Sequence, residues 1–408
     1  MRIKALVIAA TLTATGLLLA NPSHPVVISG TVTIDDATPG SLTLYCEDAK
    51  TIIEWDSFSI DTAESTYFQM SDPSFAVLNR VTGGSADIVL GNLHANGDLF
   101  LINSEGLTIT GEATIGASRI VLSSLDVSDT DFLSHHNMQF FGKEASVVNY
   151  GSITSDNSHV QLLGFHVENA GVISANAGTI SIAAAQHVIL NSINHPTLEI
   201  LSQGGSQNAV TGIDQKGTLN AIRHSLQADG SLYTTGILQQ GTIIATGSNS
   251  HQSSIRLESV SGSTTVSGMM RASNANSTGG VIQVLGKNLN INDGAVMDCS
   301  GASGGGMLFI GGGFNGSFPT MMNAENTTVA AGALIRTNAI YFGDAGPVTL
   351  FASDTTSFYG TIHATGGHYQ GNGGRVQIFG GRTLNYSGTV DNSAMNGEQG
   401  ELLFDQSQ

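Results

Sequence analysis

The segment Gly280-Val281-Ile282-Gln283-Val284 is the first of five similar segments in the C-terminal half of the chain. Each has a glycine before four mostly apolar residues, and the later four begin at Gly306, Gly346, Gly374 and Gly400. The step from Gly306 to Gly346 is the longest, and the other steps are nearly equal to one another. Self-similarity at a period of about 20–50 residues is typical of repeat architectures, so these segments predict a chain built from stacked coils.

A second series of glycines runs beside the first. Its members are Gly268, Gly294, Gly332, Gly360 and Gly388, each followed by apolar residues. Its steps are again nearly equal except for the one from Gly294 to Gly332, so both series share one oversized step. We interpret residues 314–326 as an insertion within a single coil.

The N-terminal half repeats as well. Asn149-Tyr150-Gly151-Ser152-Ile153 returns one repeat later as Asn169-Ala170-Gly171-Val172-Ile173. A repeat of about 20–28 residues that carries two or three short strands is one coil of a solenoid. A two-sheet sandwich would not produce two glycine series whose spacings change in the same way along the chain. The sequence therefore predicts an all-β fold, an elongated right-handed parallel β-helix with an N-terminal cap.

Short apolar segments bounded by Gly, Asn, Asp or Ser fill most of the remaining chain, as expected of strands and turns. Helical spacing occurs at Leu219, Ile222 and Leu226, which predicts one short helix.

Composition excludes several classes of function. The 408 residues include 51 Gly but only 7 Pro, and 11% are charged. With 14 Lys and Arg against 32 Asp and Glu, the formal net charge is -18. Such a chain cannot neutralise a run of phosphates, which argues against nucleic acid and anionic membranes as partners.

The first residues indicate export. Arg2 and Lys4 precede an uncharged apolar stretch, residues 5–20, which is too short for a typical bilayer span. This pattern predicts a secretory signal peptide over residues 1–20, cleaved on export. The two cysteines, Cys46 and Cys299, would lie about ten coils apart, or ~48 Å at ~4.8 Å per coil, so we expect them to be unpaired.

Several ordered motifs carry a family resemblance. In the N-terminal part they are residues 26–34, 52–60, 78–84, 91–103 and 124–132; in the C-terminal half they are residues 304–306, 371–374 and 397–404. Together they resemble the secretion domain and haemagglutinin-like repeats of filamentous-haemagglutinin-type exoproteins. Asn103-Ser104-Glu105-Gly106-Leu107 stands where that family usually has Asn-Pro-Asn-Gly-Ile.

The resemblance implies two-partner secretion, in which a dedicated outer-membrane β-barrel transporter reads the N-terminal domain. It implies a two-partner secretion domain with its cap over residues 21–250 and a continuing β-helix of haemagglutinin-like repeats over residues 251–408. The expected product is an adhesin-like exoprotein, secreted or at the cell surface, monomeric, with host-cell or cell-surface receptors as further partners. The truncated delivery module of a larger adhesin or toxin is an alternative.

The resemblance also places the residues that the transporter would recognise. They are expected in polar turns of an address segment, about residues 26–135, and are Asn79, Arg80, Asn96, Gly97, Asn103 and Gly106. The alternative is that these Asn and Gly residues only shape β-helix corners.

Candidate chemistry is weak elsewhere. Residues 311–316 match G-x-G-x-x-G, but no amphipathic helix follows, so a glycine-rich corner is expected there. Asp126, Asp129 and Asp131 lack a calcium-binding loop, and His135-His136 lacks further zinc ligands.

An enzyme is the main rival class, because β-helices also host polysaccharide-acting enzymes. The densest acids, Glu47-Asp48, Glu54 and Asp56, lie near Trp55, but no Ser-His-Asp or Cys-His arrangement is recognisable. We expect no catalytic residues, no cofactor and no metal site.

Overall fold

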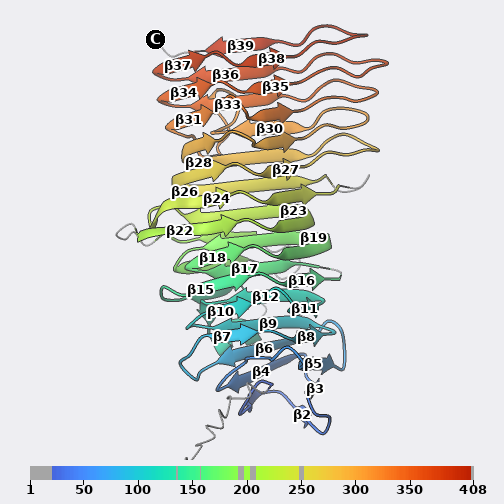
Figure 1. The fold of residues 1–408 in the computed structure, drawn as a ribbon, viewed down its shortest axis with the longest axis vertical. Coiled ribbons are helices and arrows are strands. Elements are labelled where there is room, and N and C mark those ends of the chain that lie inside the picture. Colours follow the sequence, from blue (N-terminus) through green and yellow to red (C-terminus); the bar gives the residue numbers. More distant parts are fainter. Residues whose placement is uncertain are drawn as a thin grey trace, which may run out of the picture.

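The chain forms one long stack of β coils that runs from a cap at the N-terminal end to β39 at the other (Figure 1). The computed structural model describes residues 21–134, 137–156, 158–191, 197–202, 208–247 and 252–405. The predicted signal peptide, residues 1–20, lies outside the described residues. Successive coils pair in parallel, which confirms the predicted parallel β-helix.

Each coil contributes strands to three faces, visited in the order B, C, A. Face A consists of β7 (Asp87–Val89), β10 (Leu107–Ile109), β15 (Ser146–Asn149), β18 (His166–Asn169), β22 (Asn208–Gln215), β24 (Tyr233–Gln239), β31 (Asn326–Val329), β34 (Thr355–Phe358) and β37 (Thr383–Tyr386). Face B consists of β3 (Ser41–Cys46), β5 (Ser65–Met70), β8 (Asn92–Ala95), β11 (Thr114–Ala117), β16 (Ser152–Ser155), β25 (Thr242–Ala245), β27 (Met269–Arg271), β29 (Val296–Asp298), β32 (Leu334–Arg336), β35 (Thr361–His363) and β38 (Thr389–Asp391).

Face C consists of β4 (Lys50–Trp55), β6 (Ala76–Val81), β9 (Asp98–Asn103), β12 (Arg119–Ser123), β17 (Val160–Gly164), β30 (Met307–Ile310), β33 (Val348–Ala352), β36 (Val376–Gly380) and β39 (Leu402–Asp405). Longer strands bend around a corner and belong to two faces; β19 (Val172–Ala184) and β23 (Thr218–Asp229) join B to C, and β26 (Ser254–Val266) and β28 (Val281–Ile291) join C to A.

The glycine series marks the register between coils. After the first series, Val281 pairs with Met307, and Val348 pairs with Val376, which confirms those repeats. In the second series the paired residues do not lie at equal distances after their glycines at two of the steps. Met269, directly after its glycine, pairs with Val296, which is two residues after its own, and Leu334 is related to Thr361 in the opposite sense. Two corners contain one additional buried residue, Ala295 after Gly294 and Ala333 after Gly332. The strand that follows each of these corners therefore begins one residue later. The oversized step is the predicted insertion between β30 and β31.

The predicted helix at Leu219, Ile222 and Leu226 is wrong. These residues belong to β23, with residues 218–221 on face B and 223–229 on face C. The corner shifts the inward–outward alternation by one residue, so Leu219 and Leu226 both face the core. A bent strand can therefore imitate helical spacing.

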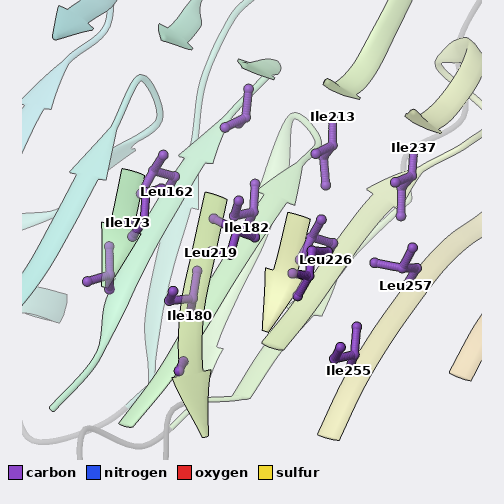
Figure 2. Packing of buried hydrophobic residues seen from close by; sticks show 14 of the residues in the cluster. Leu162, Ile173, Ile180, Ile182, Ile213, Leu219, Leu226, Ile237, Ile255 and Leu257 are labelled. Atoms are coloured by element: carbon purple, nitrogen blue, oxygen red, sulfur yellow. The ribbon is translucent and has the colours of Figure 1, made fainter. Parts of the chain in front are cut away.

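The core is a set of columns in which one coil stacks on the next. On face C, Leu162 pairs in register with Ile182, then with Leu226 and Leu257, and all four are fully buried (Figure 2). Parallel strands lie about 4.8 Å apart, so equivalent side chains meet at van der Waals distance. Each coil buries its apolar side chains only against its neighbours.

A ladder of buried amides runs along one corner. Asn149 Nδ2 donates to Asn169 Oδ1 at 2.8 Å, and Asn169 Nδ2 donates to Gln215 Oε1 at 2.9 Å. The next coil continues the ladder with Gln239, whose Nε2 donates to the Gly241 carbonyl at 3.0 Å. The repeat from Asn149 to Asn169 seen in the sequence is the first step of this ladder.

Antiparallel pairs cap the N-terminal end. The strand β1 (Val26–Ser29) pairs with β4, and β2 (Val32–Asp35) pairs with β3. An uncovered strand edge is a template for pairing with other chains, and the cap covers this edge.

A small antiparallel sheet, the side sheet, covers part of face C. Its strands are β13 (Asp126–Val127), β14 (Met138–Phe141), β20 (His187–Asn191) and β21 (Thr197–Ile200). It buries an outward-facing column of Ile52, Leu78, Phe100 and Val121. The short helix α1 (Asp129–Leu133) adds Phe132, whose ring lies 5.2 Å from that of Phe100. This second core was not expected from the sequence.

The cysteines and the glycine-rich segment agree with expectation. Cys46 and Cys299 are both free and buried, and burial raises the pKa of both thiols, that of Cys46 to about 11. Residues 311–316 form a turn that ends in the 3-10 helix η1 (Phe314–Gly316). Among the described residues, no helix is long and apolar enough to cross a membrane.

The buried His224 predicts a pH-dependent stability. Burial lowers its pKa to about 4, although its Nε2–H donates to the Ile244 carbonyl at 2.9 Å, which acts in the opposite direction. The unfolded chain binds this proton below about pH 6.5 while the folded chain does not, so stability falls as the pH drops from 6.5 to 4, by about 3 kcal/mol at pH 4. Urea titrations should show a weaker pH dependence in His224→Gln over this window. The exposed His94→Gln is the control, and equal slopes for wild type and His224→Gln would contradict the prediction.

Candidate functional site

Asn79 lies in the core near the N-terminal cap. It occupies an inward position of β6, between Ile53 and Leu101, and is fully buried. Its Oδ1 accepts a hydrogen bond from Trp55 Nε1 at 3.0 Å, and its Nδ2 donates to the Phe100 carbonyl at 3.2 Å. A buried amide must satisfy its hydrogen bonds inside the protein, so Asn79 fixes the Trp55 ring in one orientation.

Arg80 points outward from the same strand and joins the β-helix to the side sheet. Its Nε lies 2.9 Å from Asp126 Oδ1, its Nη1 lies 2.7 Å from Asp129 Oδ1, and its Nη2 donates to the Val127 carbonyl at 2.6 Å. Burial lowers the pKa of the Arg80 guanidinium, and its bonds to the two carboxylates more than offset this, so the pKa is raised. The cation therefore holds β13 and α1 against face C.

Asn96 and Gly97 form the corner between β8 and β9. The Asn96 side chain bonds to the backbone of Met70 as a neighbouring strand would. Its Oδ1 accepts from the Met70 amide at 2.7 Å, and its Nδ2 donates to the Met70 carbonyl at 2.9 Å. A Cβ at Gly97 would collide with Met70 Sδ and the Phe75 carbonyl, so only glycine fits here.

Asn103 and Gly106 shape the next corner. Asn103 Oδ1 accepts from the Glu105 amide at 2.8 Å, which closes an Asx turn, and Gly106 has φ +120°, a conformation that favours glycine. Asn103 Nδ2 donates to Asp87 Oδ2 at 2.9 Å. The corner therefore needs only Asn103 and Gly106 of the motif, and these are the two positions that match the family pattern.

Asp87 organises this part of the core, and sequence reasoning missed it. Its Oδ1 accepts from Ser57 Oγ, the Phe58 amide and Ser59 Oγ at 2.9, 3.0 and 3.0 Å. Together with Asn103 on Oδ2, these donors satisfy a carboxylate that is 2% exposed. No short motif marks Asp87 in the sequence, because the donors to its Oδ1 come from an earlier coil.

The six recognition candidates were expected in polar turns, and that placement is correct for Asn96, Gly97 and Gly106 only. Asn79 and Arg80 lie within β6, and Asn103 is the last residue of β9. Asn79 and Asn103 are 0% and 1% exposed, because both are inward-facing positions of face C. The structure brings Asn103 and Gly106 into one corner, Asn96 and Gly97 into another, and Asn79 and Arg80 onto one strand.

The remaining candidates have structural contacts. Asp126 and Asp129 bind Arg80, and Asp131 accepts from the Gln139 amide through its Oδ2. Two of the clustered acidic residues near Trp55 also have basic neighbours. Glu54 Oε1 lies 3.6 Å from Arg80 Nη1, and Asp56 Oδ2 lies 3.2 Å from His24 Nδ1. His135-His136 lies outside the described residues. Across the part of the chain that the structure describes, no group of three or more His, Cys, Asp or Glu could hold a metal ion.

A capped parallel β-helix with a side sheet pinned to its N-terminal half defines the class of exported β-helical secretion domains. The model of the TPS secretion domain matches residues 27–268, and the chain belongs to this family. It is thus a two-partner-secreted exoprotein, exported across the outer membrane to the cell surface or medium, and the resemblance read from the motifs is confirmed. The family implies an outer-membrane transporter as partner.

Individual relatives agree with this assignment. The structure of the HMW1 secretion domain from Haemophilus influenzae is similar, with a TM-score of 0.78 and 27% identity, over 94% of this chain and 100% of that one. Two proteins of Haemophilus influenzae, each described as a heme/hemopexin-binding protein, are 33% identical over 106 residues and, in strain Rd, 29% identical over 208 residues. These matches cover 26% and 48% of this chain but only 11% and 22% of those relatives.

Removing the Arg80 cation should loosen the side sheet. Arg80→Met leaves two carboxylates and the Val127 carbonyl without their partner, and should lower the free energy of unfolding by about 1–3 kcal/mol. Urea titration followed by the fluorescence of Trp55, the single tryptophan, measures the loss. Hydrogen exchange should accelerate in residues 126–141.

The matched control for Arg80→Met is Lys143→Met, which breaks an exposed ion pair with Glu105. Exposed pairs contribute about 0–1 kcal/mol, so this variant should stay close to wild type. Equal losses in the two variants would show that Arg80 does not anchor the side sheet.

Proposed function

We propose that residues 26–135 carry the address read by the outer-membrane transporter, and that Asn79, Arg80, Asn96, Gly97, Asn103 and Gly106 are read before the chain folds. The observation that carries this proposal is the burial of two of them, Asn79 and Asn103. The side chains of Asn79 and Asn103 are closed off from solvent, and Asn96 is bonded to the Met70 backbone. A transporter can contact the side chains of Asn79 and Asn103 only in a chain that has not yet formed its coils.

The same burial gives export a direction. Once the first coils close outside the membrane, each amide bonds to its own neighbours in the fold and is no longer available to the transporter. We propose that folding hides the address and thereby prevents return. The secretion domain would occupy residues 21–250, followed by the continuing repeats at 251–408.

A secretion assay with the cognate transporter separates this proposal from the corner alternative. Asn79→Ala and Asn103→Ala should each block release, because they remove groups that are read. The control Asn169→Ala removes an equally buried amide from the ladder outside residues 26–135 and should be released. Thermal melts of the three refolded variants give the structural cost, about 1–3 kcal/mol for each amide.

Under the corner alternative, release would follow the loss of stability in all three variants, the control included. Release of a chain that lacks residues 26–135 by the same transporter would end the address proposal.

We propose further that the exported chain is adhesin-like and monomeric, and contacts a cell-surface receptor through an aromatic face near its C-terminal end. Tyr341, Phe342 and Tyr369 are 51%, 54% and 60% exposed, and the Phe342 and Tyr369 rings lie 5.1 Å apart. They stand on loops that project from the stack after β32 and β35 (Figure 1). Large exposed apolar patches are typical of interaction sites. The family of secretion domains gives the enzyme alternative no support.

Replacing Phe342 and Tyr369 together by Ser should reduce binding of the purified chain to host-type cells at least tenfold, because the double change removes the aromatic contact area. The control Tyr150→Ser changes a tyrosine that is 47% exposed on the N-terminal half and should bind normally. Purified hemopexin is included as a ligand, because the two matched relatives are described as binding it. Unchanged cell binding by the double variant contradicts this proposal, and light scattering tests the monomer.

A further inference from the structure

A cavity of about 290 Å³ lies between the side-sheet strand β21 and face C, where β19, β23 and β26 run side by side. Its lining includes Arg223 of β23, Arg256 of β26 and His159 just before β17. Leu198 of β21 contributes an apolar wall. The volume approaches the range of about 300–1,000 Å³ in which small-molecule sites occur.

The charge of this lining is opposite to that of the chain. Acidic residues outnumber Lys and Arg by 32 to 14, yet none of the described residues that line the cavity is Asp or Glu. Arg223 pairs in register with Ser254, and Ser225 pairs with Arg256, so the two arginines come from adjacent coils. Two guanidinium groups on neighbouring rungs thus face one cavity of an acidic protein.

The two arginines differ in their partners. Arg256 is held by Glu258, whose Oε2 lies 2.9 Å from Nη2, and by Gln283, whose Oε1 accepts from Nη1 at 2.7 Å. Arg223 is exposed and forms no ion pair with any carboxylate in the described ranges of the chain. One cation is thus held in place by neighbouring side chains, and the other is available for an anion.

Further polar groups line the cavity or lie next to it. His159 Nδ1 accepts from the Thr179 amide at 3.1 Å, so the proton of the neutral ring is on Nε2. Ser181, 1% exposed, adds a hydroxyl. Its in-register neighbour on the preceding coil, Gln161, is fully buried, and neither atom of its amide has a partner among the described residues. Unpartnered buried amides are rare, and this one lies one rung from the cavity.

We propose that this cavity binds an oxyanion carried on a small polyhydroxylated molecule, of which an acidic sugar with a carboxylate is the best fit. The planar Arg223 fork matches a carboxylate in two parallel hydrogen bonds. The hydroxyls of Thr179 and Ser181 suit the sugar hydroxyls, and Leu198 suits a face of C–H groups. Neither the secretion address nor the aromatic face uses these residues.

Calorimetric titration of the purified, folded chain with glucuronate tests the proposal, with glucose and inorganic phosphate as the comparison ligands. Glucuronate should bind, and glucose should bind at least tenfold more weakly, because it lacks the charge. Arg223→Gln should weaken glucuronate binding at least tenfold. The control Arg271→Gln changes an exposed arginine of β27 that bonds to Ser273, and should leave binding unchanged.

Three results would overturn the proposal. The first is no heat of binding with millimolar glucuronate. The second is an affinity for glucose equal to that for glucuronate, and the third is an unchanged affinity for glucuronate in Arg223→Gln. Phosphate that binds more tightly than glucuronate would exclude the acidic sugar and identify a phosphorylated source of the oxyanion instead. Because the assay uses protein that is already exported and folded, its outcome is independent of the secretion assay.

Discussion

The pairing of each coil with the next, strand by strand and in one register, is the interaction on which the rest of the molecule depends. It stacks Leu162, Ile182, Leu226 and Leu257 into a continuous column, and it places Asn149, Asn169 and Gln215 within hydrogen-bond reach. A single coil has neither an apolar partner nor a backbone partner for its edges. The free energy of folding is therefore close to a sum over contacts between neighbouring coils, and the cap strands supply the partner for the first coil.

This dependence connects folding to export. The polar groups inside the N-terminal coils have no partner until the adjoining coil arrives: Asn79 needs Trp55, and Asp87 needs Ser57 and Ser59 from the coil before it. In an extended chain all of them are solvated and open to other contacts. The proposal that the transporter reads these side chains therefore requires two sets of partners, the transporter before folding and the adjoining coil afterwards.

The repeats made most of the architecture predictable. Each glycine series marks one corner of the coil, and the position of that corner largely sets which residues pair in successive coils. What escaped prediction depends on contacts between distant segments. Ala295 and Ala333 lengthen their corners by one residue, and only the pairings of Met269 with Val296 and of Leu334 with Thr361 reveal it. The bend in β23 imitates a helix. The burial of Asn79 could not be predicted from its own segment, because its partner Trp55 lies one coil away.

The outward column of face C changes from apolar to polar along the stack. Read along the stack, it runs through Ile52, Leu78, Phe100 and Val121, and then changes to Gln161, Ser181, Ser225 and Arg256. The apolar part lies under the side sheet, which Arg80 ties down. The polar part begins near the end of that cover, where β21 forms the wall of the cavity. The inward column stays apolar from Leu162 to Leu257 while the outward residues become polar, so this change does not disturb the core. The β-helix therefore supplies a rigid support on which the outward residues of face C hold the side sheet at one level of the stack and line the proposed ligand site at another.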